Sequence, residues 1–282
     1  GVYEIIRPAQ TAWAVFDSPH SGSEYPADFI HQISEKDMLA SEDSQVDDLF
    51  EEVPQAGGVM LRALFPRTYV DPNRRENDIK YDMIADPVNW EFGFSPSDKC
   101  RHGHGIIRET LYHMGPKLYD EPLTAAQAAQ RVKKYHQPYH AALKALIEEA
   151  HQAHGQAWHV NCHSMPASCI ISPRQVDFCL GDAFGRACDS TDFTHAVTSF
   201  LNDMGYTVSR NVPFAGGRLV EDYSNRKRGI QSLQIEINKA IYWDEQKDEP
   251  NHNYEAVKHD MTVLSEKIVE YTGQKLMPMA AN

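Results

Sequence analysis

The stretch Ala157-Trp-His-Val-Asn-Cys-His-Ser164 decides the fold that we expect of this chain. Its first four residues predict a short buried strand, and Asn161-Cys-His-Ser164 follow where that strand ends. A second short apolar run, residues 12–16, leads in the same way into Asp17-Ser-Pro-His20. Ligands of α/β proteins bind at the carboxyl ends of the strands. We therefore expect His20 and His163 to lie at one edge of a sheet.

Helix and strand patterns alternate along the rest of the sequence. Apolar stripes predict helices at residues 34–57, 124–155, 192–204 and from Tyr254 onward, and short apolar runs predict strands at 59–64, 68–70, 206–209 and 233–237. Thr124 and Gln127 form a capping box for the second helix, in which Pro138 predicts a kink or a break. Residues 72–122 show no period, and a loop of that length is usually functional. Without a Gly/Ser/Pro-rich linker, the chain is predicted to be a single α/β domain over residues 1–282 with a largely parallel sheet.

The composition argues against several classes of partner. A net charge of -13 disfavours nucleic acid and anionic membrane surfaces, although a local basic cluster would still admit a small anionic substrate. The sequence has no run of about 18 apolar residues that would span a membrane, and its first ten residues lack the pattern of a signal peptide. The five cysteines, an odd number without a C-x-x-C pair, predict reduced thiols in a cytoplasmic protein.

Two histidines at strand ends suit one metal ion held between them, although a single such histidine more often bonds a backbone carbonyl. A hydrolytic zinc site typically uses two His, one carboxylate and an open position for water. Three carboxylates are candidates for the third ligand: Glu24, close to His20 in sequence, and Asp43 and Asp47, one turn apart on the predicted helix. Asp43 lies beside the buried stripe, where a carboxylate is costly unless a cation meets it. The alternative is an acid favoured by the helix dipole.

Glu236 is the second informative acid. It alternates with Leu233, Ile235 and Ile237 in a strand that should be largely buried, and Gln234 shares its face. Burial disfavours the charged form of an isolated carboxyl, which suits a general base that works near neutral pH. A structural ion pair with Lys239 is the alternative.

The segment Asp71-Pro-Asn-Arg-Arg75 follows another predicted strand. The planar guanidinium of Arg74 matches a carboxylate, and Asn73 adds an amide donor. Ion pairs of Arg75 with nearby acids are the alternative. Arg210 and Arg218 are further candidates to hold a substrate carboxylate. A metal site at His102-Gly-His104 is not favoured, because glycine-rich loops tolerate any polar residue.

These motifs, in this order, resemble the N-formylglutamate amidohydrolase family. The matching segments span roughly residues 15–245 and are Ser18-Pro-His-Ser-Gly22, Ser41-Glu-Asp43, Val46-Asp47-x-Leu49, Asp71-x-Asn-Arg74, Gly103-x-Gly105, Tyr135-x-x-Pro-Tyr-His140, Cys162-His-Ser164 and Gln234-Ile-Glu-Ile-Asn238. The family is similar to zinc-dependent exopeptidases of the carboxypeptidase and aspartoacylase type. That similarity implies a mixed, mostly parallel sheet flanked by helices.

The resemblance also implies roles for the matching residues. His20 and His163 would be zinc ligands, and Asp43 would take the place of the carboxylate ligand, with Glu24 as the alternative. Asn73 and Arg74 would hold the substrate carboxylate, and Glu236 would be the general base.

The hypothesis that follows is a metal-dependent amidohydrolase of histidine degradation, which hydrolyses N-formyl-L-glutamate to L-glutamate and formate. Zn²⁺ is the expected cofactor, although another divalent metal would suit the same ligands, and the expected partner is a small anionic amino-acid derivative. Two alternatives stay open: the same zinc site acting on another N-acyl amino acid or a short peptide, and a non-catalytic protein of the same fold. A binding protein needs no buried base, so His20, His163 and Glu236 together disfavour the second.

Overall fold

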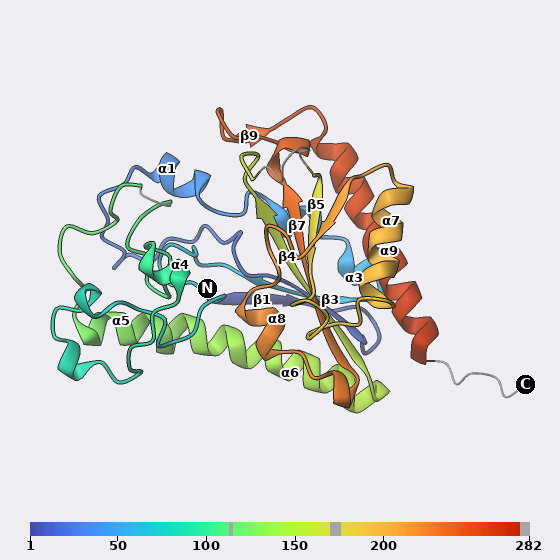
Figure 1. Ribbon diagram of the computed structural model, residues 1–282, viewed down its shortest axis with the longest axis horizontal. Helices are drawn as coiled ribbons and strands as arrows, with labels where there is room; N and C mark the ends of the chain where they lie inside the picture. The colour runs from blue at the N-terminus through green and yellow to red at the C-terminus, as the bar shows by residue number, and fades with distance from the viewer. Residues whose placement is uncertain (113–114, 170–175, 277–282) are drawn as a thin grey trace, which may run out of the picture. The chain divides into compact units, whose positions relative to one another are not determined.

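A seven-stranded sheet runs through the computed structural model of this protein (Figure 1). Its strands are β1 Tyr3–Ile6, β2 Ala14–Ser18, β3 Val59–Ala63, β4 Ala157–Met165, β5 Phe178–Gly181, β6 Val208–Arg210 and β7 Ile230–Asn238. They lie in the order β1-β3-β2-β4-β7-β5-β6. The β2/β3, β2/β4, β4/β7 and β5/β6 pairs are parallel, and β5 runs antiparallel to β7. The mixed, mostly parallel sheet predicted for this chain is confirmed.

The structure describes residues 1–112, 115–169 and 176–276. Their contacts group into two units. Unit 1 comprises Gly1–Glu4, Pro19–Asp43 and Ala63–Ala142, and unit 2 comprises Ile5–Ser18, Ser44–Arg62 and the chain from Leu143 onward. Because each unit is assembled from three segments, the sequence contains no single linker between them. Each unit is described by itself below.

Most helices of the protein are short, whereas α6, α7 and α9 are longer. The helices are α1 Glu35–Ala40, α2 Val46–Leu49, α3 Val53–Ala56, α4 Asp98–Arg101, α5 Ala125–Arg131, α6 Gln137–His154, α7 Phe193–Asp203, α8 Arg218–Asp222 and α9 Tyr254–Leu276, with a π-helical turn over Val132–His136. Single 3₁₀ turns lie at Tyr81–Met83, Pro87–Asn89, Arg226–Arg228 and Lys239–Ile241, and β8 Trp243–Asp244 pairs with β9 Glu249–Pro250. Among the described residues, no helix is both long and apolar enough to cross a membrane.

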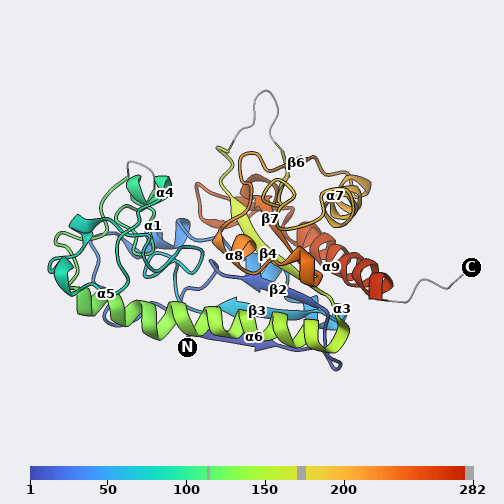
Figure 2. The same cartoon turned by 60° about the horizontal axis from the view of Figure 1, so that its bottom comes forward.

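One face of the sheet in unit 2 is an apolar core. Alternate residues of β2, β4 and β7 pack against α2, α3, α7 and α9, and the fully buried strand side chains there are Ala14, Phe16, Trp158, Val160, Cys162, Leu233, Ile235 and Ile237. Both views show α7 and α9 side by side (Figures 1 and 2). The stripe predicted for α9, from Tyr254 to Ile268, is buried as expected. Each large aliphatic side chain buried here stabilises the fold by about 1.5–3 kcal/mol.

The opposite face of the same three strands is polar. Its residues are Asp17, His159, Asn161, His163, Ser232, Gln234 and Glu236, and all of them are buried. Side chains of a strand alternate between the two faces, so one apolar and one polar series can share each strand. The parallel register between β4 and β7 places His159 beside Ser232, Asn161 beside Gln234 and His163 beside Glu236. Unit 2 therefore buries a ladder of polar pairs.

Two strand predictions need correction. Residues 68–70 lie in a turn rather than a strand. Strand β4 extends through Met165, because it pairs residue for residue with β7 as far as Asn238. His163 therefore projects from within a strand instead of following its end.

Two helix predictions need correction as well. The helix expected over 34–57 is three short helices, because the Asp43 N–H donates to the carbonyl of His20 and Gln45 adopts a left-handed φ of 55°. Asp43 thus lies in a loop before α2. The capping box of Thr124 and Gln127 is confirmed, but the long helix contains a π turn just before Pro138 rather than a break at it. π turns of this kind are frequent at functional sites.

Candidate active site

His20 and Asp43 lie together in unit 1. In the sequence, His20 follows β2 and Asp43 precedes α2. The His20 Nε2 atom is 2.8 Å from Asp71 Oδ1, and its Nδ1 atom is 3.5 Å from Asp43 Oδ2. All three side chains are buried. An ionised carboxylate only accepts hydrogen bonds, so Nε2 carries the proton and Nδ1 carries the lone pair. A metal-binding histidine typically donates its other ring N–H to a carboxylate in this way.

The Ser-Pro-His-Ser-Gly motif holds this loop in place through its backbone. The Asp43 N–H donates to the carbonyl of His20 at 3.0 Å, and the Ser21 hydroxyl donates to the carbonyl of Asp43 at 2.7 Å. A Cβ atom on Gly22 would lie 2.5 Å from backbone atoms of Leu64 and Phe65, so only glycine fits there. These contacts fix Asp43 next to His20 despite the long interval between them in sequence.

Arg67, which the sequence reasoning missed, joins the two carboxylates that flank His20. Its guanidinium donates to Asp43 Oδ1 at 2.9 Å and lies 3.7 Å from Asp71 Oδ2. Burial alone would raise the pKa of Asp71, but the hydrogen bond from His20 and the charges of Arg74 and Arg67 hold it well below its usual range. Asp71 therefore stays ionised and keeps accepting the proton of His20. A lone Arg between two predicted strands gave no sequence signal for this role.

His163 in unit 2 is oriented by a chain of buried hydrogen bonds. Asp17 Oδ1 accepts from Asn161 Nδ2 at 2.7 Å and from His159 Nε2 at 2.8 Å. With its amide nitrogen on Asp17, Asn161 turns its Oδ1 atom to His163 Nε2 at 2.8 Å. His163 must donate from Nε2 to that oxygen, which leaves the lone pair on Nδ1. His163 thus has the same tautomer as His20.

Glu236 is the cross-strand neighbour of His163 on the polar face of the sheet. Its Oε1 atom accepts from Gln234 Nε2 at 2.8 Å, and Gln234 in turn accepts from the backbone N–H of Gly217 at 2.7 Å. Glu236 is buried. The carboxylate is thereby held beside the imidazole of His163, where a proton acceptor could serve a bound water.

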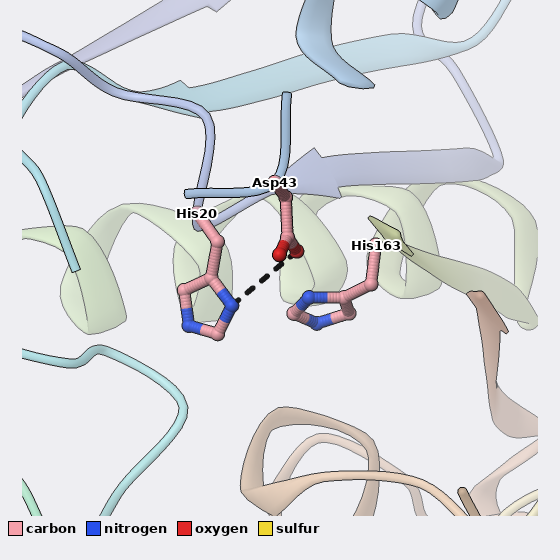
Figure 3. Close-up of side chains that lie close together, drawn as sticks. All are labelled: His20, Asp43 and His163. Atoms are coloured by element: carbon pink, nitrogen blue, oxygen red, sulfur yellow. Dashed lines mark ion pairs between the residues drawn. The ribbon is translucent and has the colours of Figure 1, made fainter. Parts of the chain in front are cut away.

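His20, Asp43 and His163 form a group that fits a metal ion (Figure 3). One ligand atom of each lies within 4.8 Å of the other two. Two imidazoles and one carboxylate are the donor set typical of a hydrolytic divalent metal site. The two alternative acids lie elsewhere in the described chain: Glu24 pairs with the N-terminal amine, and Asp47 faces Arg62 at 3.7 Å.

Asn73 and Arg74 lie in a rigid loop of unit 1. The Asn73 N–H donates to Asp71 Oδ1, and Arg74 donates from Nη1 to the carbonyl of Asn73 and from Nε to that of His104, all at 2.7–2.8 Å. Both side chains are buried. The loop thus carries one arginine, oriented by backbone carbonyls, next to the acid that supports His20.

The π turn before α6 secures this loop from the other side. His136 donates from Nε2 to the carbonyl of Arg74, and His140 donates from Nε2 to that of Pro72, both at 2.8 Å. Their rings stack with centroids 4.1 Å apart. In the sequence, Tyr135 to His140 is recognised only as a family motif. In the structure, two histidines of this motif bond backbone carbonyls of the loop that contains Arg74.

His136 should make the protein sensitive to acid. Burial, together with the nearby His140, lowers the pKa of His136 from 6.5 to about 3. Below pH 6.5 the unfolded chain binds a proton at His136, whereas the folded chain does not. The contribution of His136 to the free energy of unfolding is therefore full above pH 6.5 and is lost as the pH falls toward 3. We expect this residue to account for about 2 kcal/mol of lost stability between pH 7 and pH 5. Urea unfolding of wild type and His136→Gln at both pH values measures it, and identical pH dependence would contradict it.

Arg210 and Arg218 make other contacts in unit 2. Arg210, on the edge strand β6, is exposed and donates to the carbonyl of Ser190 at 2.6 Å. Arg218 lies on α8, where its guanidinium pairs with Asp222 and lies 3.8 Å from Glu221. Their proposed contact with a substrate carboxylate stays a prediction.

Comparison with known proteins identifies the family of this chain. A model of the N-formylglutamate amidohydrolase family matches residues 13–243. The crystal structure of an N-formylglutamate amidohydrolase from Ralstonia eutropha JMP134 superposes with a TM-score of 0.91 at 38% identity, covering 97% of this chain and 99% of that one. An N-formylglutamate deformylase of Pseudomonas putida is 23% identical over 235 residues, 80% of each chain. A gene product of Agrobacterium tumefaciens shares the fold, with a TM-score of 0.66 at 16% identity over 97% of this chain and 96% of that one.

The family match covers most of the sequence and includes every residue of the candidate site. The Ralstonia relative extends the likeness over nearly the full length of both chains. This chain is an amidohydrolase and belongs to the N-formylglutamate amidohydrolase family.

Proposed function

We propose that this protein hydrolyses N-formyl-L-glutamate to L-glutamate and formate with one Zn²⁺ ion, as a step of histidine degradation. The observation that supports it most is the grouping of His20, Asp43 and His163, with Glu236 as the cross-strand neighbour of His163. The printed names of the Ralstonia and Pseudomonas relatives support the substrate.

Zn²⁺ bound by these three side chains would act as a Lewis acid toward the formyl oxygen and a water molecule. Glu236 accepts a proton from the attacking water, whose oxygen bonds to the formyl carbon. Glu236 then passes that proton to the amide nitrogen as the C–N bond breaks, which releases the amine of glutamate and formate. Arg74 and Asn73 hold a carboxylate of the substrate and orient the scissile amide.

The direct test measures formate release from N-formyl-L-glutamate by the purified protein loaded with Zn²⁺. We expect turnover that is abolished by a chelator and restored by added Zn²⁺. N-acetyl-L-glutamate and a formylated dipeptide provide the matched comparison, because they change only the acyl group or the leaving amine. If either compound is cleaved faster than N-formyl-L-glutamate, that compound becomes the better candidate for the substrate. If none of the three is cleaved, the proposed activity is wrong.

A further inference from the structure

A small hairpin in unit 1 brings the buried Arg108 and the half-buried His104 close to the loop of Asn73 and Arg74. His104 and Arg108 are partners in an isolated antiparallel bridge, so their side chains project on the same side of the hairpin. The carbonyl of Ile106 accepts from the Asp71 N–H at 2.8 Å, and the carbonyl of His104 accepts from Arg74 Nε at 2.8 Å. The hairpin is therefore bonded directly to the segment that contains Arg74.

The hairpin is held in that place by a close backbone contact. A Cβ atom on Gly105 would lie 2.5 Å from the carbonyl oxygen of Asp78 and 2.8 Å from the sulfur of Cys100. The Ile106 N–H donates to the same carbonyl of Asp78 at 2.8 Å. Only glycine allows this approach, which gives the Gly103-x-Gly105 motif a physical role.

Arg108 and His104 each bury a nitrogen for which the described residues provide no hydrogen-bond partner. Arg108 is 5% exposed and donates from Nη1 to the carbonyl of Leu111 at 3.1 Å, but its Nε atom is buried and unbonded. The Nε2 atom of His104 is also buried and unbonded. Burying an unsatisfied donor costs about 1–3 kcal/mol, and such groups in native proteins call for a functional explanation. A ligand with acceptor oxygens would bond the Nε–H of Arg108, and it would bond His104 in the tautomer that carries its proton on Nε2.

Both basic and acidic side chains lie near the hairpin. Burial and the charge of Arg67 lower the pKa of Arg108 to about 9, although Asp71 and Glu42 act in the opposite direction. Burial and the charges of Arg108, Arg67 and Arg74 lower the pKa of His104 to about 3, so its ring is neutral. The guanidinium groups of Arg67, Arg74 and Arg108 therefore lie near one another, among the carboxylates of Glu42, Asp43 and Asp71.

We propose that Arg108 and His104 form a second carboxylate subsite, which binds the side-chain carboxylate of the substrate while Asn73 and Arg74 bind its α-carboxylate. This assignment rests on the proposed hydrolysis of an N-formyl amino acid and deepens it. The enzyme then selects dicarboxylic N-formyl amino acids over monocarboxylic ones. In the competing explanation, Arg108 is a structural counter-ion of Glu42. Replacing Arg108 would then change kcat/KM for all substrates by the same factor.

The experiment compares kcat/KM for N-formyl-L-glutamate and N-formyl-L-glutamine, which differ only in the charge and donor pattern of the side chain. We expect wild type to prefer the glutamate compound and Arg108→Met to lower that preference by about 10–100-fold, the loss typical of a charge-assisted hydrogen-bonded pair. His104→Ala should lower the preference by a smaller factor. The matched control is Arg131→Met: Arg131 is also a buried arginine of unit 1, stacked 4.1 Å from the Tyr69 ring and bonded to Tyr119. Its loss should leave the preference unchanged.

A preference that is the same in Arg108→Met and wild type would overturn the subsite. If Arg108→Met does not fold, inhibition of the wild-type enzyme decides: glutarate should inhibit at least tenfold more strongly than butyrate, and equal inhibition would reject a second carboxylate site. Failure of the proposed function is distinguishable, because wild type would then release formate from neither formyl substrate.

Discussion

Replacing Glu236 by glutamine is expected to lower kcat for N-formyl-L-glutamate by about 10²–10⁴-fold while one metal ion stays bound per chain. The amide keeps the shape of the carboxylate and can still accept the hydrogen bond from Gln234, but it cannot take a proton from water. Since Glu236 lies beside His163 and is not one of the grouped ligands, its loss should not empty the metal site. Steady-state kinetics together with metal analysis of the same sample measure both effects.

The control for this change is Glu270→Gln, the same chemical substitution on the exposed side of α9. It should leave kcat and metal content at wild-type values. If Glu236→Gln turns over N-formyl-L-glutamate at the wild-type rate, the general-base role is wrong. Loss of metal together with turnover would instead make Glu236 part of the metal site.

Replacing His163 by alanine is expected to reduce bound Zn²⁺ from one ion per chain to a small fraction and to abolish turnover. Loss of a residue that only supports a ligand typically costs 10–100-fold in metal affinity, so loss of a ligand should cost more than about 100-fold. Mass spectrometry of the native protein and a competitive chelator titration measure the stoichiometry and the affinity. His154→Ala, which removes a half-buried histidine of α6 outside the grouped ligands, is the control and should retain the ion.

The same titration separates the candidates for the carboxylate ligand. Asp43→Ala should lose Zn²⁺ as His163→Ala does, whereas Glu24→Ala should keep it, because Glu24 is exposed and paired with the N-terminal amine. Full retention of the ion by Asp43→Ala would remove Asp43 from the metal site. Retention by His163→Ala would overturn the whole ligand assignment.

Local sequence patterns were enough to predict the class of fold and the burial of several candidate site residues. Alternation along residues 233–237 placed Glu236 and Gln234 on one face, and the structure finds both on the polar face of β7. The apolar stripe of α9 and the capping box at Thr124 are confirmed for the same reason. Each of these features depends on residues a few positions apart, whose spacing alone determines which way their side chains point.

The long-range contacts could not be read from such patterns. The place of Asp43 depends on backbone hydrogen bonds to the His20 loop, and these bonds also interrupt the helix that its neighbours predicted. Arg67 contacts Asp43 and Asp71, and no local sequence pattern pairs it with these two acids.

The amino-acid sequence determined which side chains alternate along each strand, and so which residues could be buried together. Only the tertiary structure decided the partners of those residues: Asp17 for Asn161, Asp71 for His20, and the hairpin of Arg108 for the loop of Arg74. The physical reason is that a buried polar group must find its hydrogen-bond partner, and that partner can come from any part of the chain that folding brings near.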